Sequence, residues 1–414
     1  MASPLSEADL AAGARLMARL DAFAAFTDEP GRLTRLFLSD AHRRAAAAFI
    51  AWCGEAGLAA RIDAAGNVVA RFEGKRKGAP ALMLGSHIDT VRDAGRYDGN
   101  YGALAALAVV ETLRAGGERL DHAIEIVAFG DEEGVRFRTT LTGSRALAGA
   151  YLEEALDQRD ASGVAMRDAL RAFGGDPDKA VSIRADTVAA FVEAHIEQGP
   201  VLEAEGLPLG VVTAINGATR LEVGVDGMAG HAGATPMKLR RDALTAAAEM
   251  ALAIEARARL ETDLVATVGR LEIWPGATNV IPGHAQFSID LRAPDDERRA
   301  AALADIKARI DAIAAARGAR ASLAKTHEAN AFVCDPRIVA GLTRVVEELG
   351  VSPRLLPSGA GHDTMILGGL CPAGMLFVRC KGGISHNPLE SITVEDCAFG
   401  LAALTRFVRD FQIT

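Results

Sequence analysis

Short apolar runs alternate with helical patterns through the first half of the chain. Asn67–Phe72, Ala81–Ile88, Ala123–Phe129 and Val188–Ile196 are apolar runs bounded mostly by turn-forming or polar residues, which predicts buried strands. Tyr101–Arg114 lies between the second and third runs and has helical spacing. Strands that alternate with helices predict an α/β sheet, in which functional sites gather at the carboxyl ends of the strands.

The order of the elements changes from about Val211. Strands are predicted at Arg220–Val225, Leu264–Trp274, Ala285–Arg292 and Ala319–Lys325, with helices at Arg240–Ala258 and Asp296–Arg317. This β-α-β-β-α-β order is typical of a compact, ferredoxin-like α+β domain. The first pattern then resumes, with a helix at Pro336–Leu349 and a strand at Met375–Val378. We therefore predict a discontinuous α/β domain, residues 1–212 and 329–414, interrupted by a smaller domain, residues 213–328.

The composition narrows the possible partners. The 414 residues are 50% hydrophobic and 24% charged, which is enough apolar material for a large core. The 45 Lys and Arg against 54 Asp and Glu give a net charge of −9 without a basic block, which argues against nucleic-acid binding. No apolar stretch approaches the roughly 20 residues of a membrane span, and the first residues lack the basic start of a secretory signal. The five scattered cysteines indicate free thiols, so we expect a cytoplasmic protein without membrane partners.

Histidines and carboxylates follow several of the predicted strands. The candidates are His87 and Asp89 after the second strand, Asp98 before the next helix, Glu132 and Glu133 after the third strand, His195 at the end of the fourth, and His386 in a late glycine-containing loop. Separately, they allow plain structural interpretations, such as an Asp-Gly turn or a solvated acidic loop. Together, at the carboxyl ends of strands in one sheet, they are the ligand types that bind divalent, zinc-like ions.

The spacing within two of these motifs suggests a role for each of their residues. His87 and Asp89 point to the same side of the chain, so the aspartate can accept a proton from the far ring nitrogen and orient the imidazole. An aspartate that bridges two ions holds them about 3.5–4 Å apart, and such pairs activate a shared water. One of the adjacent residues Glu132 and Glu133 can bind metal while the other remains free as a general base.

The order and spacing of these motifs resemble those of the di-zinc aminopeptidase/acylase superfamily through nearly the whole chain. That superfamily has a catalytic domain with an inserted lid and dimerisation domain. Two features narrow the resemblance to the hydantoinase/carbamoylase amidases. His195 stands in His-Ile-Glu-Gln-Gly-Pro, where many relatives have Asp or Glu, and His231 stands in Gly-His-Ala-Gly-Ala-Thr-Pro-Met. These amidases include N-carbamoyl-L-amino acid hydrolases, β-ureidopropionases and allantoate amidohydrolases.

The resemblance implies a role for each candidate. His87 and His195 would bind one divalent ion, Glu133 and His386 the other, and Asp98 would bridge both. Asp89 would support His87, Glu132 would take a proton from the bridging water, and His231 would stabilise the oxyanion. The two ions would be zinc, with manganese, cobalt or nickel as alternatives.

The resemblance also implies a substrate site and an assembly. Arg292 and Asn279 match the carboxylate clamp of the family, and a planar guanidinium suits carboxylate recognition. The backbone amides of Ala360 and Gly361, which precede a predicted helix, can add donors, and Gln198 can contact the ureido group. The substrate would be a small ureido carboxylate, and the protein a homodimer formed through the inserted domain.

Two features favour allantoate as the substrate. Gly134-Val135-Arg136-Phe137 resembles the allantoate enzymes, and Arg220 aligns with an arginine that contacts substrate in them. The sequence departs from the pattern of many relatives at Ala234 and at Arg138-Thr139-Thr140. N-carbamoyl-L-amino acid hydrolase or β-ureidopropionase activity therefore remains as an alternative. A dipeptidase or a catalytically silent dimeric scaffold is less consistent with the sequence, because His195 and the clamp argue against the first and the retained Glu132 against the second.

The remaining polar candidates have weaker patterns. Asp131 is interpreted as either a supporting or a solvated carboxylate, Glu197 as structural, and His362 as a helix cap. Four other histidines have no partner motif and are expected to be surface or packing residues: His42, His122, His284 and His327.

Overall fold

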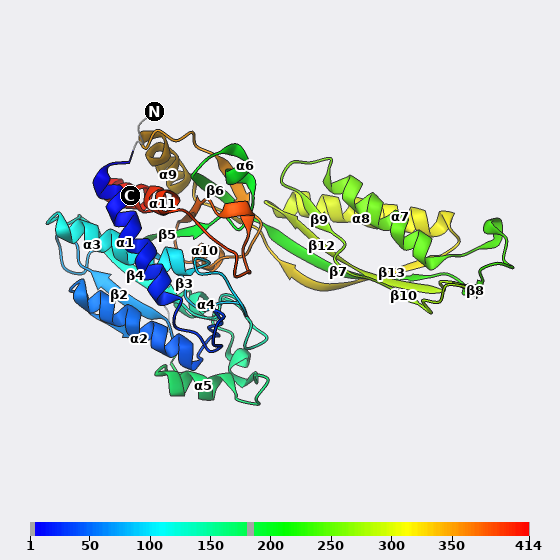
Figure 1. The fold of residues 1–414 in the computed structure, drawn as a ribbon, viewed down its shortest axis with the longest axis horizontal. Helices are drawn as coiled ribbons and strands as arrows, with labels where there is room; N and C mark the ends of the chain where they lie inside the picture. Colours follow the sequence, from blue (N-terminus) through cyan, green and yellow to red (C-terminus); the bar gives the residue numbers. More distant parts are fainter. Residues whose placement is uncertain (1–4, 180–185, 414) are drawn as a thin grey trace. The chain divides into compact units, whose positions relative to one another are not determined.

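The chain folds into two compact units in a computed structural model that describes residues 5–179 and 186–413 (Figure 1). The first unit comprises Met1–Thr213, Cys334–Leu356 and Ala360–Thr414, and the second comprises Ala214–Val333 and Pro357–Gly359. Among the described helices, none combines the length and the apolar character that a membrane span requires. The predicted mixed α/β class is confirmed.

A nine-stranded sheet, most of whose residues belong to the first unit, has the order β1-β2-β4-β3-β5-β16-β6-β14, with β15 paired to β6. Its strands are β1 (Ala60–Ile62), β2 (Val68–Phe72), β3 (Ala81–His87), β4 (Ala123–Phe129), β5 (Val188–Ile196), β6 (Leu209–Ile215), β14 (Phe332–Val333), β15 (Leu355–Ser358) and β16 (Ala373–Val378). The four central strands, β4, β3, β5 and β16, are parallel to one another. Their carboxyl ends therefore lie at the same edge of the sheet.

Helices cover both faces of this sheet. The larger ones are α1 (Glu7–Phe23), α2 (Asp40–Glu55), α3 (Asn100–Ala115), α9 (Pro336–Glu348) and α11 (Val394–Asp410), and the shorter ones are α4 (Thr142–Leu147), α5 (Met166–Phe173), α6 (Val201–Glu205) and α10 (Asp363–Leu367). Val192 and Ala194 of β5 join the apolar core that α3 and α11 help to form, whereas Glu193 between them accepts a hydrogen bond from Thr364 of α10. Successive strand residues point to opposite faces, so α3 and α10 lie on opposite sides of the sheet.

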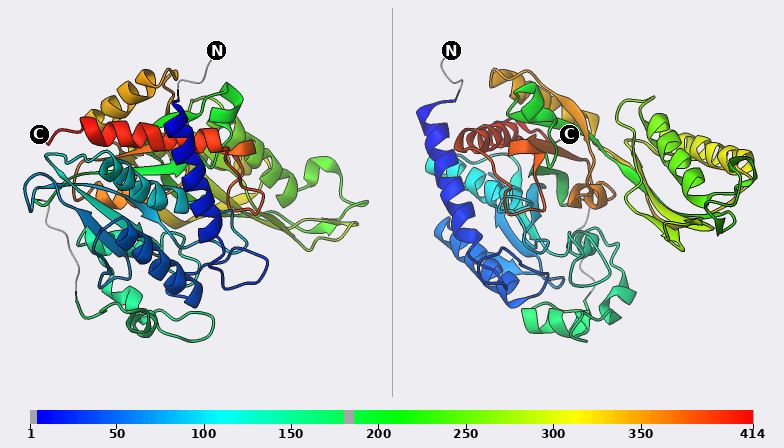
Figure 2. Two further views of the ribbon diagram at one scale, coloured as in Figure 1. Left: turned by 60° about the vertical axis from the view of Figure 1, so that its left-hand side comes forward. Right: turned by 45° about the vertical axis from the view of Figure 1, so that its right-hand side comes forward.

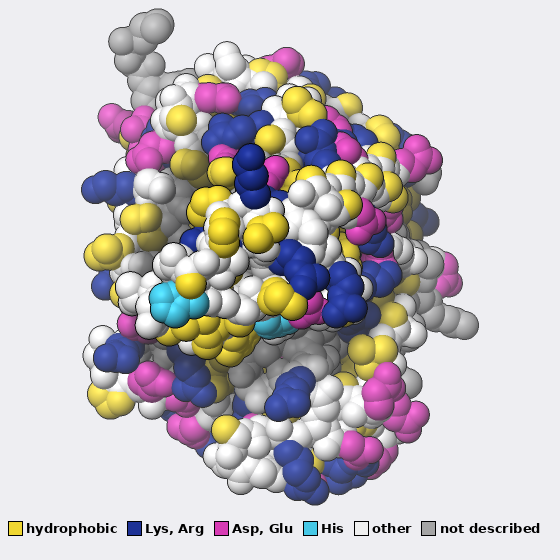
Figure 3. All heavy atoms as spheres, turned by 90° about the vertical axis from the view of Figure 1, so that its right-hand side faces the viewer, with side chains coloured by type: hydrophobic (Ala, Val, Ile, Leu, Met, Phe, Trp, Pro, Cys, Tyr) yellow, Lys and Arg dark blue, Asp and Glu magenta, His cyan; other side chains and the backbone are white. Residues whose placement is uncertain are grey.

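The second unit contains a five-stranded antiparallel sheet with two helices on one face (Figure 2). Its order is β10-β12-β7-β13, with β9 paired to β12; the strands are β7 (Gly217–Asp226), β9 (Val265–Thr267), β10 (Leu271–Trp274), β12 (His284–Ala293) and β13 (Arg320–Ala329). Helices α7 (Ala243–Ala258) and α8 (Asp296–Ala316) pack on the sheet, and β8 (Gly230–His231) pairs with β11 (Val280–Ile281). Positive and negative side chains are interspersed on the molecular face shown in Figure 3.

One predicted strand of this unit is wrong as a continuous element. Leu264–Trp274 forms two strands, β9 and β10, because the two segments pair with different parts of β12. Strand β9 lies beside Asp290–Arg292, and β10 lies beside His284–Phe287. The intervening residues, which include Gly269, shift the chain from one part of β12 to the other.

Candidate metal centre

The first unit brings histidines and carboxylates together at the carboxyl ends of its parallel strands. His87 is the last residue of β3, His195 lies one residue before the end of β5, and Glu132 and Glu133 follow β4. Asp98 lies just before α3, where Gly99 has a φ of 64°. A Cβ at Gly99 would lie 2.4 Å from the ring of His87, so glycine lets this turn approach the imidazole.

Asp98 lies at the centre of this cluster. Its Oδ1 is 3.1 Å from Nε2 of His195 and 3.4 Å from Nε2 of His87. Its Oδ2 is 3.2 Å from Nε2 of His386, which in turn lies 3.5 Å from Oε2 of Glu133. The two carboxylate oxygens of Asp98 thus face two different groups of side chains.

The histidines and carboxylates of this region form several potential metal-binding groups, and two of these groups share Asp98. The first is His87, Asp98 and His195, and the second is Asp98, Glu133 and His386; within each group the candidate ligand atoms lie within 4.8 Å of one another. Imidazole and carboxylate ligands suit zinc and similar divalent ions. The donor set therefore fits two divalent ions with Asp98 between them.

The electrostatics of the cluster favour bound cations. Burial, together with the adjacent Asp98, raises the pKa of Glu133 to about 7, and burial raises the pKa of Glu132 well above its usual range. A hydrogen bond to Asp98 raises the pKa of His386 to about 9. Carboxylates this close repel one another when ionised, and divalent cations would compensate that charge.

Asp89 contacts His87 through its backbone oxygen and not, as was expected, through its carboxylate. Nδ1 of His87 lies 3.0 Å from the backbone oxygen of Asp89 but 3.9 Å from its carboxylate oxygen Oδ1. The carboxylate instead accepts the backbone N–H groups of Glu132 and Glu133, at 3.2 and 3.3 Å. The aspartate therefore orients the imidazole through its main chain and the two glutamates through its side chain.

The structure adds two residues that the sequence patterns did not single out. Ser385 Oγ lies 3.0 Å from both Asp98 Oδ2 and Glu390 Oε2. Oε1 of the buried Glu390 accepts the backbone N–H groups of Tyr97 and Asp98, at 2.8 and 3.1 Å. Glu390 therefore holds the loop that carries Asp98. Ser385 directly precedes the predicted ligand His386 in the same loop, whereas Glu390 belongs to no recognisable short motif, and its contact with Tyr97 spans 293 residues of sequence.

Gln198, which was expected to contact the substrate, lies beside the same carboxylate. Its Nε2 donates a hydrogen bond of 2.8 Å to Oδ2 of Asp98 and lies 3.2 Å from Ser385 Oγ. Its Oε1 is buried and has no hydrogen-bond partner among the described residues. This amide oxygen is available to accept a hydrogen bond from a ligand.

The structure also places two of the weaker candidates and the two predicted backbone donors before α10. His362 is the N-cap residue of α10, but its side chain makes no capping hydrogen bond; its ring packs edge-on against His195 at 4.6 Å. Asp131 is buried rather than solvated and accepts a hydrogen bond from Thr142. Ala360 and Gly361 lie immediately before this N-cap residue.

The other predicted substrate residues belong to the second unit. Arg220 and Arg292 both bind Asp290 and line a cavity of about 610 Å³. Nδ1 of His231 accepts the N–H groups of Gly233 and Ala234, at 3.1 and 3.2 Å. The backbone oxygen of Asn279 accepts a hydrogen bond from Ala232, beside the same β8 strand.

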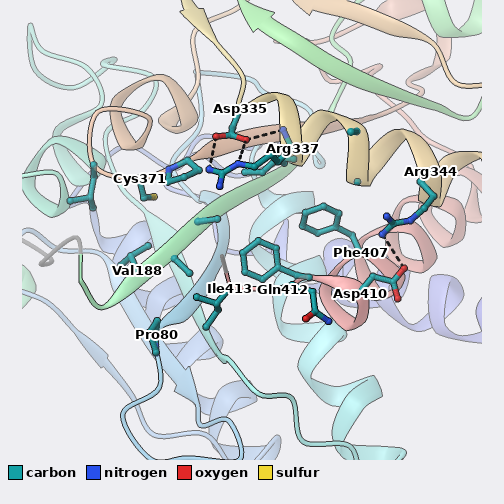
Figure 4. Close-up of a pocket in the computed structure, with 18 of the residues that line it drawn as sticks. Pro80, Val188, Asp335, Arg337, Arg344, Cys371, Phe407, Asp410, Gln412 and Ile413 are labelled. Atoms are coloured by element: carbon teal, nitrogen blue, oxygen red, sulfur yellow. Dashed lines mark hydrogen bonds and ion pairs between the residues drawn. The ribbon is translucent and has the colours of Figure 1, made fainter.

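A larger cavity, of about 700 Å³, lies at the opposite edge of the sheet in the first unit (Figure 4). Its lining includes Pro80 before β3, Val188 at the start of β5 and Phe407 of α11. Figure 4 shows two ion pairs at this cavity, Asp335 with Arg337 and Arg344 with Asp410. Because it lies at the amino ends of β3 and β5, this cavity is separate from the cluster around Asp98.

Comparison with known proteins identifies the family. Residues 83–410 match the family described as peptidase family M20/M25/M40. The chain is 43% identical to an N-carbamoyl-L-amino acid amidohydrolase of Geobacillus stearothermophilus (95% of this chain, 97% of that protein) and 40% identical to an allantoate deiminase of Arabidopsis thaliana (94% and 80%). A crystal structure of a hydantoinase/carbamoylase family amidase from Burkholderia multivorans superposes with a TM-score of 0.91 at 34% identity, covering 95% of this chain and 96% of that one. The chain therefore belongs to the peptidase family M20/M25/M40 and, within it, to the hydantoinase/carbamoylase amidases.

Proposed function

We propose that the protein is a metal-dependent amidohydrolase that cleaves a ureido C–N bond of a small carboxylate substrate. The observation that carries this proposal is the position of Asp98, whose two oxygens face separate histidine-containing groups. His87 and His195 would bind one ion, Glu133 and His386 the other, and Asp98 both. Two divalent ions, when bound, polarise a carbonyl and lower the pKa of water. We propose zinc, with manganese, cobalt or nickel as alternatives.

Glu132 is proposed as the general base and acid. Its Oε2 lies 3.9 Å from Nε2 of His87, so the carboxylate is next to the proposed metal centre. Glu132 would take a proton from the attacking water as the water oxygen bonds to the ureido carbon. It would then give that proton to the terminal nitrogen as its bond to the ureido carbon breaks, which releases ammonia and leaves a carbamate that loses CO2.

We assign the substrate contacts to polar groups of both units. The Nδ1 of His231 accepts backbone N–H groups, which leaves Nε2 as the N–H donor of the ring, where it can donate to an oxyanion. Arg292 and Asn279 would bind the substrate carboxylate, with the backbone amides of Ala360 and Gly361 as further donors. Gln198 would accept a hydrogen bond from the ureido group through its unpaired Oε1.

Allantoate is the proposed substrate. Arg220 lies in the same ion-pair cluster as Arg292, so two guanidinium groups line one cavity. An additional cation suits a substrate that carries two ureido arms and a carboxylate on one carbon. The alternative is an N-carbamoyl-L-amino acid, which the name of the Geobacillus stearothermophilus relative supports.

Release of ammonia by the purified protein tests this proposal. The enzyme would be loaded with Zn²⁺ or Mn²⁺ and assayed with allantoate, N-carbamoyl-L-amino acids, N-carbamoyl-β-alanine and a dipeptide. We expect the fastest turnover with allantoate. Preference for an N-carbamoyl amino acid would retain the chemistry and change the substrate, whereas no release from any ureido compound by the metal-loaded protein would refute the proposal.

We also propose that the second unit forms an inserted domain of residues 213–328. This domain would act as a lid and would join two copies of the chain into a homodimer. Helix α7 leaves Leu252 67% exposed, and Leu260 just beyond it is 69% exposed. Exposed large apolar side chains of this kind are typical of interaction surfaces. Light scattering should give the mass of a dimer, and Leu252→Glu with Leu260→Glu should give a monomer.

The five cysteines are buried and unpaired, which supports a cytoplasmic location.

A further inference from the structure

Three strands of the second unit place charged and titratable side chains in one row. Arg220 of β7 is paired in register with Asp290 of β12 and with His327 of β13. Directly paired residues on neighbouring strands share a face of the sheet, and so does Arg292, two residues beyond Asp290. The intervening residues Leu221, Ile289 and Leu291 point to the apolar core under α7 and α8. The charged row therefore lies on the face that these helices leave open.

Asp290 holds two arginines at once. Its Oδ1 accepts a hydrogen bond from Nε of Arg292 at 2.8 Å, and its Oδ2 accepts one from Nη2 of Arg292 at 2.9 Å. The same Oδ2 accepts a hydrogen bond from Nε of Arg220 at 3.1 Å. The Asp290 and Arg292 side chains are only 29% and 30% exposed, so water screens this pair less than a pair on the open surface.

Among the described residues, these contacts leave two N–H groups of the Arg292 guanidinium unused. A guanidinium has five N–H groups, and three of those of Arg292 are used: two by Asp290 and one by the carbonyl of Gly359, which accepts from Nη1 at 2.7 Å. One N–H therefore remains on Nη1 and one on Nη2. Two such donors can bind a carboxylate through both of its oxygens.

We propose that Asp290 is a positioning residue, which fixes the Nε edge of Arg292 so that its two remaining Nη donors bind the substrate carboxylate. The inference rests on the proposed function, because it takes Arg292 as the carboxylate-binding residue. Asp290 does not contact the substrate in this proposal. It acts by ordering Arg292 and, through Oδ2, Arg220.

The charge of the cluster also limits the class of ligand. Arg220, Asp290 and Arg292 together carry one net positive charge, since the hydrogen bond from Arg292 lowers the pKa of Asp290 and keeps it ionised. Burial and the neighbouring Arg220 lower the pKa of His327, which leaves that ring neutral. A single net positive charge suits one carboxylate group on the ligand.

A plain ion pair without this role predicts a different outcome. If Asp290 merely neutralised Arg292, its removal would free more N–H donors and would leave carboxylate binding unchanged or stronger. If Asp290 orders Arg292, its removal lets the long side chain occupy several conformations, and carboxylate binding weakens. The sign of the change in KM therefore separates the two interpretations.

Steady-state kinetics of the metal-loaded enzyme test the proposal. We expect Asp290→Ala to raise KM for allantoate or N-carbamoyl-L-alanine at least tenfold, with kcat changed less than threefold. KM for N-carbamoyl-L-alaninamide, which lacks the carboxylate, should not change, whereas general damage to the fold would alter both substrates. Asp290→Asn, which keeps one acceptor oxygen for Arg292, should give an intermediate KM and provides the test if the alanine variant does not fold.

A double-mutant cycle shows whether Asp290 acts through Arg292. In an Arg292→Ala background, Asp290→Ala should raise KM for N-carbamoyl-L-alanine much less than in the wild type, because the guanidinium that binds the carboxylate is gone and only Arg220 is left to position. Asp226→Ala is the matched control: Asp226 lies on the same open face of β7 and pairs with His284 instead, at 2.8 Å. Its KM should equal that of the wild type. Additive effects of Asp290 and Arg292, or an unchanged KM in Asp290→Ala, would overturn the proposal.

Failure of this inference is distinguishable from failure of the proposed function. A wild-type enzyme that releases no ammonia contradicts the proposed function. Calorimetric titration of the metal-free protein with N-carbamoyl-L-alanine measures binding without turnover, and here too Asp290→Ala should weaken the affinity at least tenfold. Equal affinities of wild type and Asp290→Ala would refute the positioning role whether or not the enzyme is active.

Discussion

Replacing Glu390 by alanine should destabilise the protein and weaken metal binding at the same time. The buried carboxylate of Glu390 accepts two backbone N–H groups, from Tyr97 and Asp98, and lies 3.0 Å from Ser385 Oγ. Alanine removes all of these acceptors. The backbone of Asp98, the residue between the two proposed ions, then loses its anchor.

The magnitude follows from the groups that alanine leaves unsatisfied. A buried donor without a partner costs about 1–3 kcal/mol, so the two N–H groups together predict a loss of about 2–6 kcal/mol in the free energy of unfolding. Glu390→Gln keeps an oxygen for the two N–H groups, and its amide can donate to Ser385, so it should cost less than about 2 kcal/mol by the same reasoning. Groups that support metal ligands typically contribute about 10–100-fold to metal affinity, and we expect Glu390→Ala to lose that much zinc affinity.

Urea unfolding of chelator-treated proteins measures the loss in the free energy of unfolding without a contribution from metal. Competition with a chelator of known affinity measures the loss of zinc affinity. Glu197→Ala is the matched control, because Glu197 is also buried and accepts two backbone N–H groups, from Val201 and Leu202, at 2.7 and 3.0 Å. It should lose similar stability but little zinc affinity. A loss below about 1 kcal/mol in Glu390→Ala, or equal losses in alanine and glutamine variants, would refute the reasoning.

Three further outcomes are expected. Glu132→Gln should retain both ions by metal analysis but lose at least about 10²–10⁴ in kcat, the usual contribution of general acid–base catalysis, and full activity would exclude the proposed base. Removal of metal by a chelator should lower Tm, because ions that bind only the folded state stabilise it by about 2.7 kcal/mol at a concentration of 100 times Kd. Re-addition of Zn²⁺ should restore Tm, and an unchanged Tm would contradict stabilising metal binding. His42 is buried, its Nδ1 accepts the N–H of Leu38 at 2.9 Å, and burial lowers its pKa to about 3. The unfolded chain, with a histidine pKa near 6.5, takes up this proton first, so stability should fall as pH drops from about 6.5 towards 3, by at most about 1.4 kcal/mol per pH unit from this residue. His42→Asn should flatten that slope in urea unfolding, and a parallel slope would refute the assignment.

The parts of the fold that local patterns determine could be predicted from the sequence. Val188–Ile196 is a strand with the predicted bounds, and Tyr101–Arg114 differs from α3 by one residue at each end. The burial pattern explains this success, because both segments are almost entirely buried and therefore almost continuously apolar. Strands β1, β6 and β15 were not predicted; β1 and β15 are only three and four residues long, too short for a period to emerge.

The supporting contacts of the candidate site could not be predicted in the same way. Ser385 and Glu390 contact Asp98 across 287 and 292 residues of sequence, and only the neighbouring predicted ligand His386 indicates that this loop lies near Asp98. Asp290 stands two residues before Arg292, yet it meets Arg220 only because β7 and β12 pair in register. Local patterns identify residues that occupy strand ends, whereas these contacts depend on tertiary packing and strand pairing.

The environments of Glu132 and Glu133 support different roles for these adjacent residues. Glu133 has a fixed side chain: its Oε1 accepts the N–H of Val91 at 3.2 Å, and its Oε2 faces His386 at 3.5 Å. The Glu132 carboxylate has only the 3.9 Å contact with His87 as an ion pair, and among the described residues no hydrogen bond to it is present. A carboxylate that accepts no hydrogen bonds keeps its affinity for a proton. Burial raises the pKa of Glu132 further. Because a metal ligand needs a fixed direction and a base needs proton affinity, Glu133 suits the ion and Glu132 suits the proton.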